Sequence, residues 1–147
     1  MRSTPTLPKV ELHVHLEGTI RPHTLLSLAG RNGLDLPARS EEELAALYDY
    51  RDFAHFIDVW ILTTNCLRTA DDFRQVVVDY ATEAASCGAV YLEGIFSPAE
   101  RVATGVEWDA LFNGYCALAH HPLPRLVAAG VPCSVSTDDP AMFGTDL

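Results

Sequence analysis

The chain has 147 residues, 48% of them hydrophobic, and its 20 acidic against 10 basic residues give a formal net charge of −10. This size suits one domain with a sizeable core. The negative charge argues against nucleic acid or an anionic membrane as a partner and favours a small-molecule substrate. Residues 1–16 lack the apolar core of a signal peptide, and no segment offers the ~20 apolar residues of a membrane span, so we expect a cytoplasmic protein.

Residues 9–16 alternate polar and apolar side chains, which predicts a β-strand. One face of this strand is expected to carry the apolar residues Val10, Leu12, Val14 and Leu16. The other face is expected to carry Lys9, Glu11, His13 and His15.

Helices are expected over the next segment of the chain. One follows Pro22 and stops at Gly33, and another starts at Ser40, a favourable N-cap. Residues 52–62 carry aromatic side chains at helical spacing, which suits either core packing or the lining of an apolar pocket. The longest helix is predicted over residues 69–88, with Thr69 as its candidate cap.

Strands are expected again after residue 88. Residues 89–96 are nearly continuously apolar, as expected of a parallel strand covered on both faces. A helix within 106–116, a short helix within 121–130 and a strand within 131–137 follow. This alternation predicts the α/β class. Residues 116–122, which we call the seam, pass from one helical pattern to another without an intervening strand.

Two polar clusters are expected at the carboxyl ends of strands, where α/β folds place their active sites. His13 and His15 lie two apart and so point the same way, which suits two ligands of one metal ion. Asp138 and Asp139 follow the last predicted strand, where one carboxylate could complete a zinc site and the other could face a substrate. Half-exposed strand histidines and an Asp-Asp-Pro turn are the alternative interpretations.

Other chemistry-bearing residues are less informative. Glu17 completes a His-x-Glu pattern, but the second cysteine that zinc-dependent cytidine deaminases need after Pro132-Cys133 is absent. Glu93 lies within an apolar strand and should meet a partner inside the fold. The histidines at 120–121 lie in the seam and are weak candidates for a third metal ligand. The four cysteines form no CxxC pair, which argues against a zinc knuckle.

The segments LPKVELHVHLEGTIRP (7–22), YLEGIFSP (91–98) and STDDPAMFGTDL (136–147) resemble signatures of the adenosine deaminase family, within the metal-dependent amidohydrolase superfamily. The resemblance implies a (β/α)8 TIM-barrel lineage and one Zn²⁺ per chain. It implies hydrolytic deamination of adenosine, adenine or aminodeoxyfutalosine to the 6-oxo product plus ammonia. The segment EGIFSP lacks an arginine found near this place in many adenosine-specific members, which favours the other two substrates.

The resemblance also implies residue roles. His13 and His15 would be zinc ligands from the first strand, and Asp138 a catalytic zinc ligand from the last strand that orients the attacking water. Asp139 would hydrogen-bond a purine ring nitrogen, and Glu17 would contact the ribose or an equivalent substrate group. The apolar lid over the substrate would include Phe53, Ile57 and Trp60.

The central motifs of the family are absent: there is no His-Ala-Gly-Glu, no later catalytic histidine and no Cys-Pro motif. We therefore expect a single, internally deleted domain over residues 1–147, with an N-terminal segment (residues 1–116) and a C-terminal segment (residues 117–147). Such a chain would form an incomplete barrel with only the first and last strand-helix units. Two alternatives remain: an inactive, partner-dependent or self-associating fragment, and another metal-dependent hydrolase. The sequence leaves the oligomeric state open.

Overall fold

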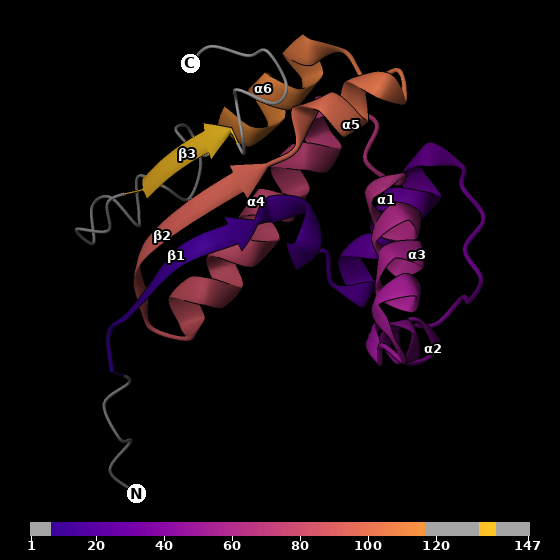
Figure 1. The fold of residues 1–147 in the computed structure, drawn as a ribbon, viewed down its shortest axis with the longest axis horizontal. Coiled ribbons are helices and arrows are strands. Elements are labelled where there is room, and N and C mark those ends of the chain that lie inside the picture. Colours follow the sequence, from indigo (N-terminus) through magenta and orange to yellow (C-terminus); the bar gives the residue numbers. More distant parts are fainter. Residues whose placement is uncertain (1–6, 117–132, 138–147) are drawn as a thin grey trace, which may run out of the picture.

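The structure is a computed structural model that describes residues 7–116 and the backbone of residues 133–137. Within these residues three parallel strands form one sheet in the order β1-β2-β3, shown in Figure 1. The strands are β1 (Lys9–His15), β2 (Ala89–Phe96) and β3 (Cys133–Thr137). All three predicted strands are confirmed, whereas the helix predicted within 121–130 lies outside the described residues.

The predicted helices of residues 22–116 are also confirmed. Between β1 and β2 the chain forms η1 (Leu16–Thr19), α1 (Pro22–Asn32), α2 (Glu41–Ala45), η2 (Ala46–Tyr48), α3 (Phe53–Thr64) and α4 (Ala70–Ser86). After β2 follow α5 (Pro98–Ala103), which the sequence pattern did not predict, and α6 (Trp108–Cys116). None of the helices among the described residues is long and apolar enough to cross a membrane.

Local signals explain where these helices begin and end. The side chains of Ser40, Asp52 and Thr69 accept hydrogen bonds from backbone N–H groups in the first turns of α2, α3 and α4. Gly33 ends α1 with φ +62°, a conformation that suits glycine. The unpredicted α5 starts with Pro98 at its first position, a favourable place for proline.

Helix α4 runs along one face of the strands in Figure 1. The core is one cluster in which residues of α4 pack with the sheet and with α1, α2 and α6. Helices α1, α2 and α3 gather beyond the carboxyl ends of the strands. Helix α6 packs closely on α4 because Gly114 has no side chain: a Cβ there would lie 2.5 Å from Phe73 Cβ and 2.6 Å from the carbonyl oxygen of Ala70. The sheet and these two helices therefore form a layered α/β unit that holds the strand ends in place.

Asp72 ties α1 to α4 from a fully buried position. Its carboxylate accepts hydrogen bonds from Arg31 Nη1 at 2.7 Å and Asn32 Nδ2 at 2.9 Å. It also accepts from the backbone N–H groups of Arg68 at 3.0 Å and Thr69 at 2.9 Å. Burial raises the pKa of this carboxyl, but the hydrogen bonds outweigh burial and the net pKa lies below its usual value.

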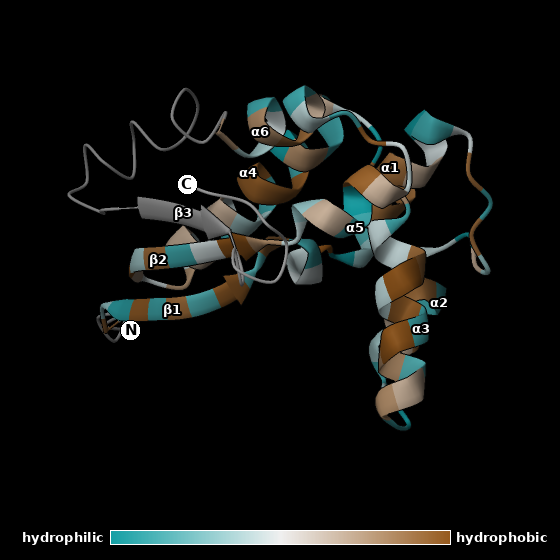
Figure 2. Ribbon diagram, turned by 45° about the horizontal axis from the view of Figure 1, so that its top comes forward, coloured by the Kyte–Doolittle hydropathy of each residue, from teal (hydrophilic) through white to brown (hydrophobic). Residues whose placement is uncertain are grey.

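The apolar face predicted for β1 is exposed in the first half of the strand and buried at its end. Val10 is 62% and Leu12 59% exposed, whereas Val14 and Leu16 are buried. The register of β1 against β2 shifts between Glu11 and Val14. All residues of β1 before Val14 are exposed, so both faces of this half of the strand are open among the described residues. Figure 2 shows hydrophobic residues on β1 at the edge of the sheet.

Burial of β2 also differs from the expectation. Gly94, Ile95 and Phe96 are buried at its carboxyl end, but Val90 near its start is 41% exposed. The strand is therefore covered at its carboxyl end and open at its beginning among the described residues. A parallel strand covered along its whole length needs helices or further strands on both faces.

Candidate metal and substrate site

Two imidazoles meet at the carboxyl end of β1. Nε2 of His13 and Nε2 of His15 are 3.2 Å apart, and the ring centroids are separated by 5.1 Å. Two nitrogens that each lie ~2.0–2.1 Å from a tetrahedral zinc ion are about 3.3 Å apart. The pair therefore has the spacing of two zinc ligands, and the same spacing allows one ring to donate a hydrogen bond to the other.

The two histidines differ in their surroundings. His13 is exposed, whereas His15 is half-buried and meets the indole of Trp60 edge-on, with 6.2 Å between ring centroids. Trp60 belongs to α3, so this helix packs over the end of β1. Contact with a large, rigid ring restricts the orientations that the His15 imidazole can adopt.

The histidine pair is the part of the predicted metal site that lies within the described residues. Within the described residues, no three His, Cys, Asp or Glu side chains lie close enough to hold a metal ion. Asp138, Asp139 and the histidines at 120–121 lie outside those residues. That Asp138 shares one ion with His13 and His15 therefore stays a prediction.

The position of β3 bears on that prediction. In a closed barrel the last strand pairs with the first. Here β3, which ends at Thr137, pairs with β2, so two strand spacings, about 10 Å, separate its backbone from β1. In this sheet, a metal ligand that follows Thr137 would have to span this distance to reach an ion held by β1. In a closed barrel, where the last strand pairs with the first, the distance would be shorter.

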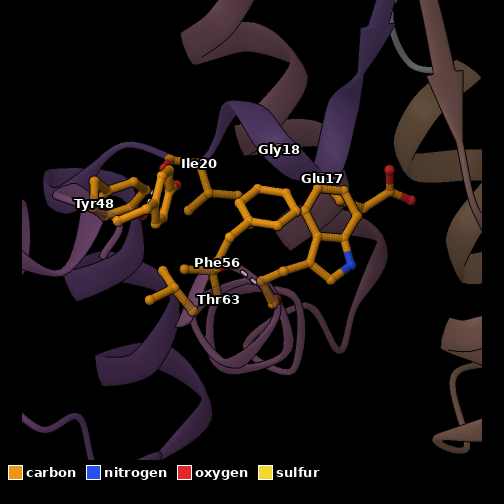
Figure 3. Close-up of a pocket in the computed structure, with 9 residues that line it drawn as sticks. Glu17, Gly18, Ile20, Tyr48, Phe56 and Thr63 are labelled. Atoms are coloured by element: carbon orange, nitrogen blue, oxygen red, sulfur yellow. Dashed lines mark hydrogen bonds between the residues drawn. The ribbon is translucent and has the colours of Figure 1, made fainter. Parts of the chain in front are cut away.

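An aromatic pocket lies beside the histidine pair, in the space between η1 and α3. Figure 3 shows its walls, which include Gly18, Ile20, Tyr48, Phe56 and Thr63. Trp60 also lines the pocket. The space inside is about 30 Å³, enough for water-sized molecules but not for a purine. The rings of Phe56 and Trp60 lie 6.2 Å apart, four residues from each other on one face of α3.

The three predicted lid residues are placed differently. Trp60 lines the pocket, Ile57 is half-buried outside the pocket walls, and Phe53 is 76% exposed and stacks on Phe56. The aromatic face predicted over residues 52–62 includes Phe56, and of the two interpretations of that face the lining of a pocket holds for Phe56 and Trp60. Sequence reasoning missed Tyr48 as a pocket residue.

Glu17, predicted to contact the substrate, is 1% exposed. The backbone N–H of Ser97 donates to its Oε1 at 2.9 Å, which joins the turn after β1 to the end of β2. Burial raises the pKa of the Glu17 carboxyl, and the hydrogen bond from Ser97 only partly offsets this. In Figure 3 the carboxylate points away from the cluster of aromatic rings.

Glu93 has the internal partner that the sequence predicted. The hydroxyl of Tyr91 donates a hydrogen bond to the Glu93 carboxylate. The two residues lie two apart on β2, so their side chains share one face of the strand.

The chain matches known proteins over most of its length. The family model described as adenosine deaminase matches residues 8–115. An aminodeoxyfutalosine deaminase from Acidothermus cellulolyticus is 60% identical over 114 residues, which are 78% of this chain and 32% of that protein. An adenine deaminase from Vibrio parahaemolyticus is 36% identical over 108 residues, which are 74% of this chain and 32% of that protein.

Solved structures agree with this result. An adenine deaminase from Arthrobacter aurescens superposes with a TM-score of 0.73 at 30% identity, over 91% of this chain and 39% of that one. An amidohydrolase from Burkholderia ambifaria, solved with bound zinc, superposes with a TM-score of 0.66 over 92% of this chain and 38% of that one. At 22% identity the second likeness concerns the fold alone.

These likenesses confirm the predicted lineage. The structural neighbours are TIM-barrel amidohydrolases, and the three described strands represent a portion of such a barrel. The chain spans about a third of the length of the curated relatives it matches. Because the family match covers residues 8–115 and the neighbours share the barrel architecture, the chain belongs to the adenosine deaminase family.

Proposed function

We propose that the chain carries the first metal ligands and the lid of a zinc-dependent deaminase that acts on a 6-aminopurine. The observation that carries this proposal is the 3.2 Å separation of His13 Nε2 and His15 Nε2 at the carboxyl end of β1. Because the chain belongs to a deaminase family, we interpret this spacing as that of two zinc ligands. The zinc would be held by these two nitrogens and by Asp138.

Aminodeoxyfutalosine is the substrate we favour. Identity is 60% with an aminodeoxyfutalosine deaminase but 36% with an adenine deaminase. Ile95 lies in the EGIFSP segment, where many adenosine-specific members have an arginine nearby, and it pairs in register with His15. An apolar side chain beside the metal ligand offers no charge to a substrate group at this point of the site.

The reaction is a hydrolysis. The oxygen of water bonds to the purine carbon that bears the amino group, the carbon–nitrogen bond breaks, and ammonia leaves with the 6-oxo purine as the other product. Bound zinc supplies the Lewis acidity that lowers the pKa of water to about 7. Asp138 would orient the water, Asp139 would hydrogen-bond a ring nitrogen, and Trp60 would help to exclude solvent.

The general acid is the component that this sequence does not supply, because the family's His-Ala-Gly-Glu motif is absent. We therefore expect the 147-residue chain alone to retain zinc binding better than deaminase activity. A chimera tests the proposal: residues 7–116 replace the matching segment of the Acidothermus cellulolyticus enzyme, which is 60% identical. Ammonia release is then measured with aminodeoxyfutalosine, adenine and adenosine.

The expected result is deamination of aminodeoxyfutalosine by the chimera and a loss of at least about 10³-fold in kcat/KM in its His13→Ala variant. The control is His23→Ala, which removes an exposed histidine of α1. Two results would refute the proposal. One is retention of activity in His13→Ala, and the other is a chimera that folds and binds zinc but releases no ammonia. Preference for adenine would refute the favoured substrate only.

A second candidate, a self-associating fragment, is favoured by the exposed apolar residues of β1. Val10 and Leu12 are 62% and 59% exposed on a strand at the edge of the described sheet. Exposed apolar edge strands promote association. Sedimentation of the full chain over a range of concentrations tests this candidate, and a monomer at all concentrations would refute it.

A further inference from the structure

Strand β1 holds an extra residue directly before the histidine pair. Glu11 of β1 pairs with Leu92 of β2, and Val14 pairs with Gly94. Three residue steps along β1 therefore lie beside two along β2, and we call this irregularity the β1 bulge. Bulges occur next to active sites, where they change the direction of a side chain.

The bulge places Glu11 and Val14 on the same face of the sheet, the face along which α4 runs. Paired residues of neighbouring strands point to one side. On β2, Leu92 packs against the core cluster that contains residues of α4, and a Cβ on Gly94 would lie 3.0 Å from the buried Leu16. Val14 belongs to the same cluster. Glu11, which pairs with Leu92, therefore also points to the α4 side.

Strict alternation along β1 would place Glu11 elsewhere. Residues 11, 13 and 15 would then share one face, and the Glu11 carboxylate would lie beside both imidazoles. With the bulge, His13 and His15 occupy the face opposite Val14, and Glu11 lies on the other one. In agreement with this, Glu11 does not form a group of three potential metal ligands with His13 and His15, both of which are described residues.

Tyr80 of α4 holds Glu11 in this place. Its hydroxyl donates a hydrogen bond to the Glu11 carboxylate. Tyr80 is 9% exposed and belongs to the core cluster, so its ring is a fixed support. Burial raises the pKa of Tyr80 and the bond to Glu11 raises it further, so the hydroxyl keeps its proton and remains a donor at neutral pH.

Little else in the side chains of β1 holds the bulge. All residues of this strand before Val14 are exposed, so burial contributes little to their placement. The hydrogen bond from Tyr80 joins this exposed half of the strand to the core.

We propose that Tyr80 is a positioning residue for His13. Through Glu11 it fixes the β1 bulge, and the bulge sets the backbone from which His13 Nε2 lies 3.2 Å from His15 Nε2. Groups that hold a metal ligand in place before the ion binds strengthen metal binding. The inference rests on the proposed zinc site and extends it to a helix on the opposite face of the sheet.

Two neutral substitutions of Glu11 in the full chain isolate the hydrogen bond from the charge. Glu11→Gln keeps an oxygen that can accept from Tyr80, whereas Glu11→Ala does not. We expect zinc affinity, measured by competition with a chromophoric chelator, to fall about three- to ten-fold in Glu11→Ala and in Tyr80→Phe. Glu11→Gln should bind zinc like the wild type. Because Glu11 is exposed, its substitutions leave the core intact.

The control is Thr24→Val. Thr24 donates a hydrogen bond to the carboxylate of Asp79, the neighbour of Tyr80 on α4, at 2.6 Å, but it belongs to α1. This variant loses the same kind of bond to the same helix without a change at β1, and its zinc affinity should not change. Equal weakening in Thr24→Val, or equal affinities in Glu11→Ala and Glu11→Gln, would overturn the positioning role.

A second readout needs no zinc. We expect the imidazole resonances of His13, recorded by NMR on the folded chain, to shift in Tyr80→Phe and Glu11→Ala and to stay in place in Thr24→Val. Unshifted His13 resonances in the first two variants would overturn the inference. Failure of the proposed zinc site has a different signature, since the wild type and His13→Ala would then bind zinc equally while the resonances still decide the role of Tyr80.

Discussion

Replacing Asp72 should destabilise the fold more than any surface change, because this buried carboxylate accepts four hydrogen bonds from α1 and from the start of α4. In Asp72→Ala the exposed Arg31 can return to water. The N–H groups of Arg68 and Thr69 lose their acceptor, and a buried unpaired donor costs ~1–3 kcal/mol. We expect the free energy of unfolding to fall by ~3 kcal/mol, which lowers Tm by roughly 6–12 °C for a chain of this size.

The pH dependence of this loss follows from the lowered pKa of Asp72. The folded state holds the carboxylate ionised at pH values where the unfolded chain has begun to bind the proton. The stabilisation is thus fully present above the ordinary value of 3.8 and is lost as pH falls through the lower folded-state pKa. The difference in the free energy of unfolding between wild type and Asp72→Ala should therefore shrink as pH falls from the ordinary pKa to the lower folded-state pKa.

Chemical denaturation monitored by circular dichroism at several pH values measures both effects. Asp71→Ala is the matched control, since Asp71 lies next in the chain but is exposed and contributes only through the helix dipole, ~0.3–1 kcal/mol. Equal losses in the two variants would refute the account of Asp72. A difference that stays constant from neutral to strongly acidic pH would refute its charge-dependent component.

Three further changes probe other regions of the molecule. Gly114→Ala should lower the free energy of unfolding by about 1–3 kcal/mol in denaturant titrations, because its Cβ would clash with Ala70 backbone on α4; an unchanged midpoint would contradict this packing. Tyr48→Phe should cost about 1 kcal/mol at neutral pH by removing the hydrogen bond to the Ile20 carbonyl. Burial raises the pKa of Tyr48 to about 12, so the unfolded chain loses this proton at a lower pH than the folded state. The free energy of unfolding of the wild type should therefore fall as pH rises from 10 towards 12, and it should fall less in Tyr48→Phe. Leu12→Thr should reduce concentration-dependent sedimentation without lowering Tm, and association that persists unchanged would argue against the β1 edge.

Local signals made much of the fold predictable. Ser40, Thr69 and Gly33 set helix limits through hydrogen bonds and backbone conformations that depend on a few neighbouring residues. The apolar run of β2 likewise indicated a parallel strand. Such features need no knowledge of distant contacts, so sequence patterns report them well.

Features that depend on tertiary contacts were not predictable in the same way. Val10 and Leu12 are exposed because no described element covers the first half of β1, and the register of this strand shifts where it pairs with β2. The burial of Glu17 depends on Ser97, eighty residues away, and on helices that follow β2. The spacing of His13 and His15 was the feature of the site that the sequence could specify, because residues two apart on a strand point the same way.

The central claim is that these two histidines are ligands of one zinc ion. Zinc bound to the purified full chain can be quantified by elemental analysis, and its affinity by competition with a chromophoric chelator. We predict one zinc per chain in the wild type and at least about ten-fold weaker binding in His13→Ala and in His15→Ala, with His23→Ala unchanged. Equal zinc binding by the wild type and all three variants would contradict the claim.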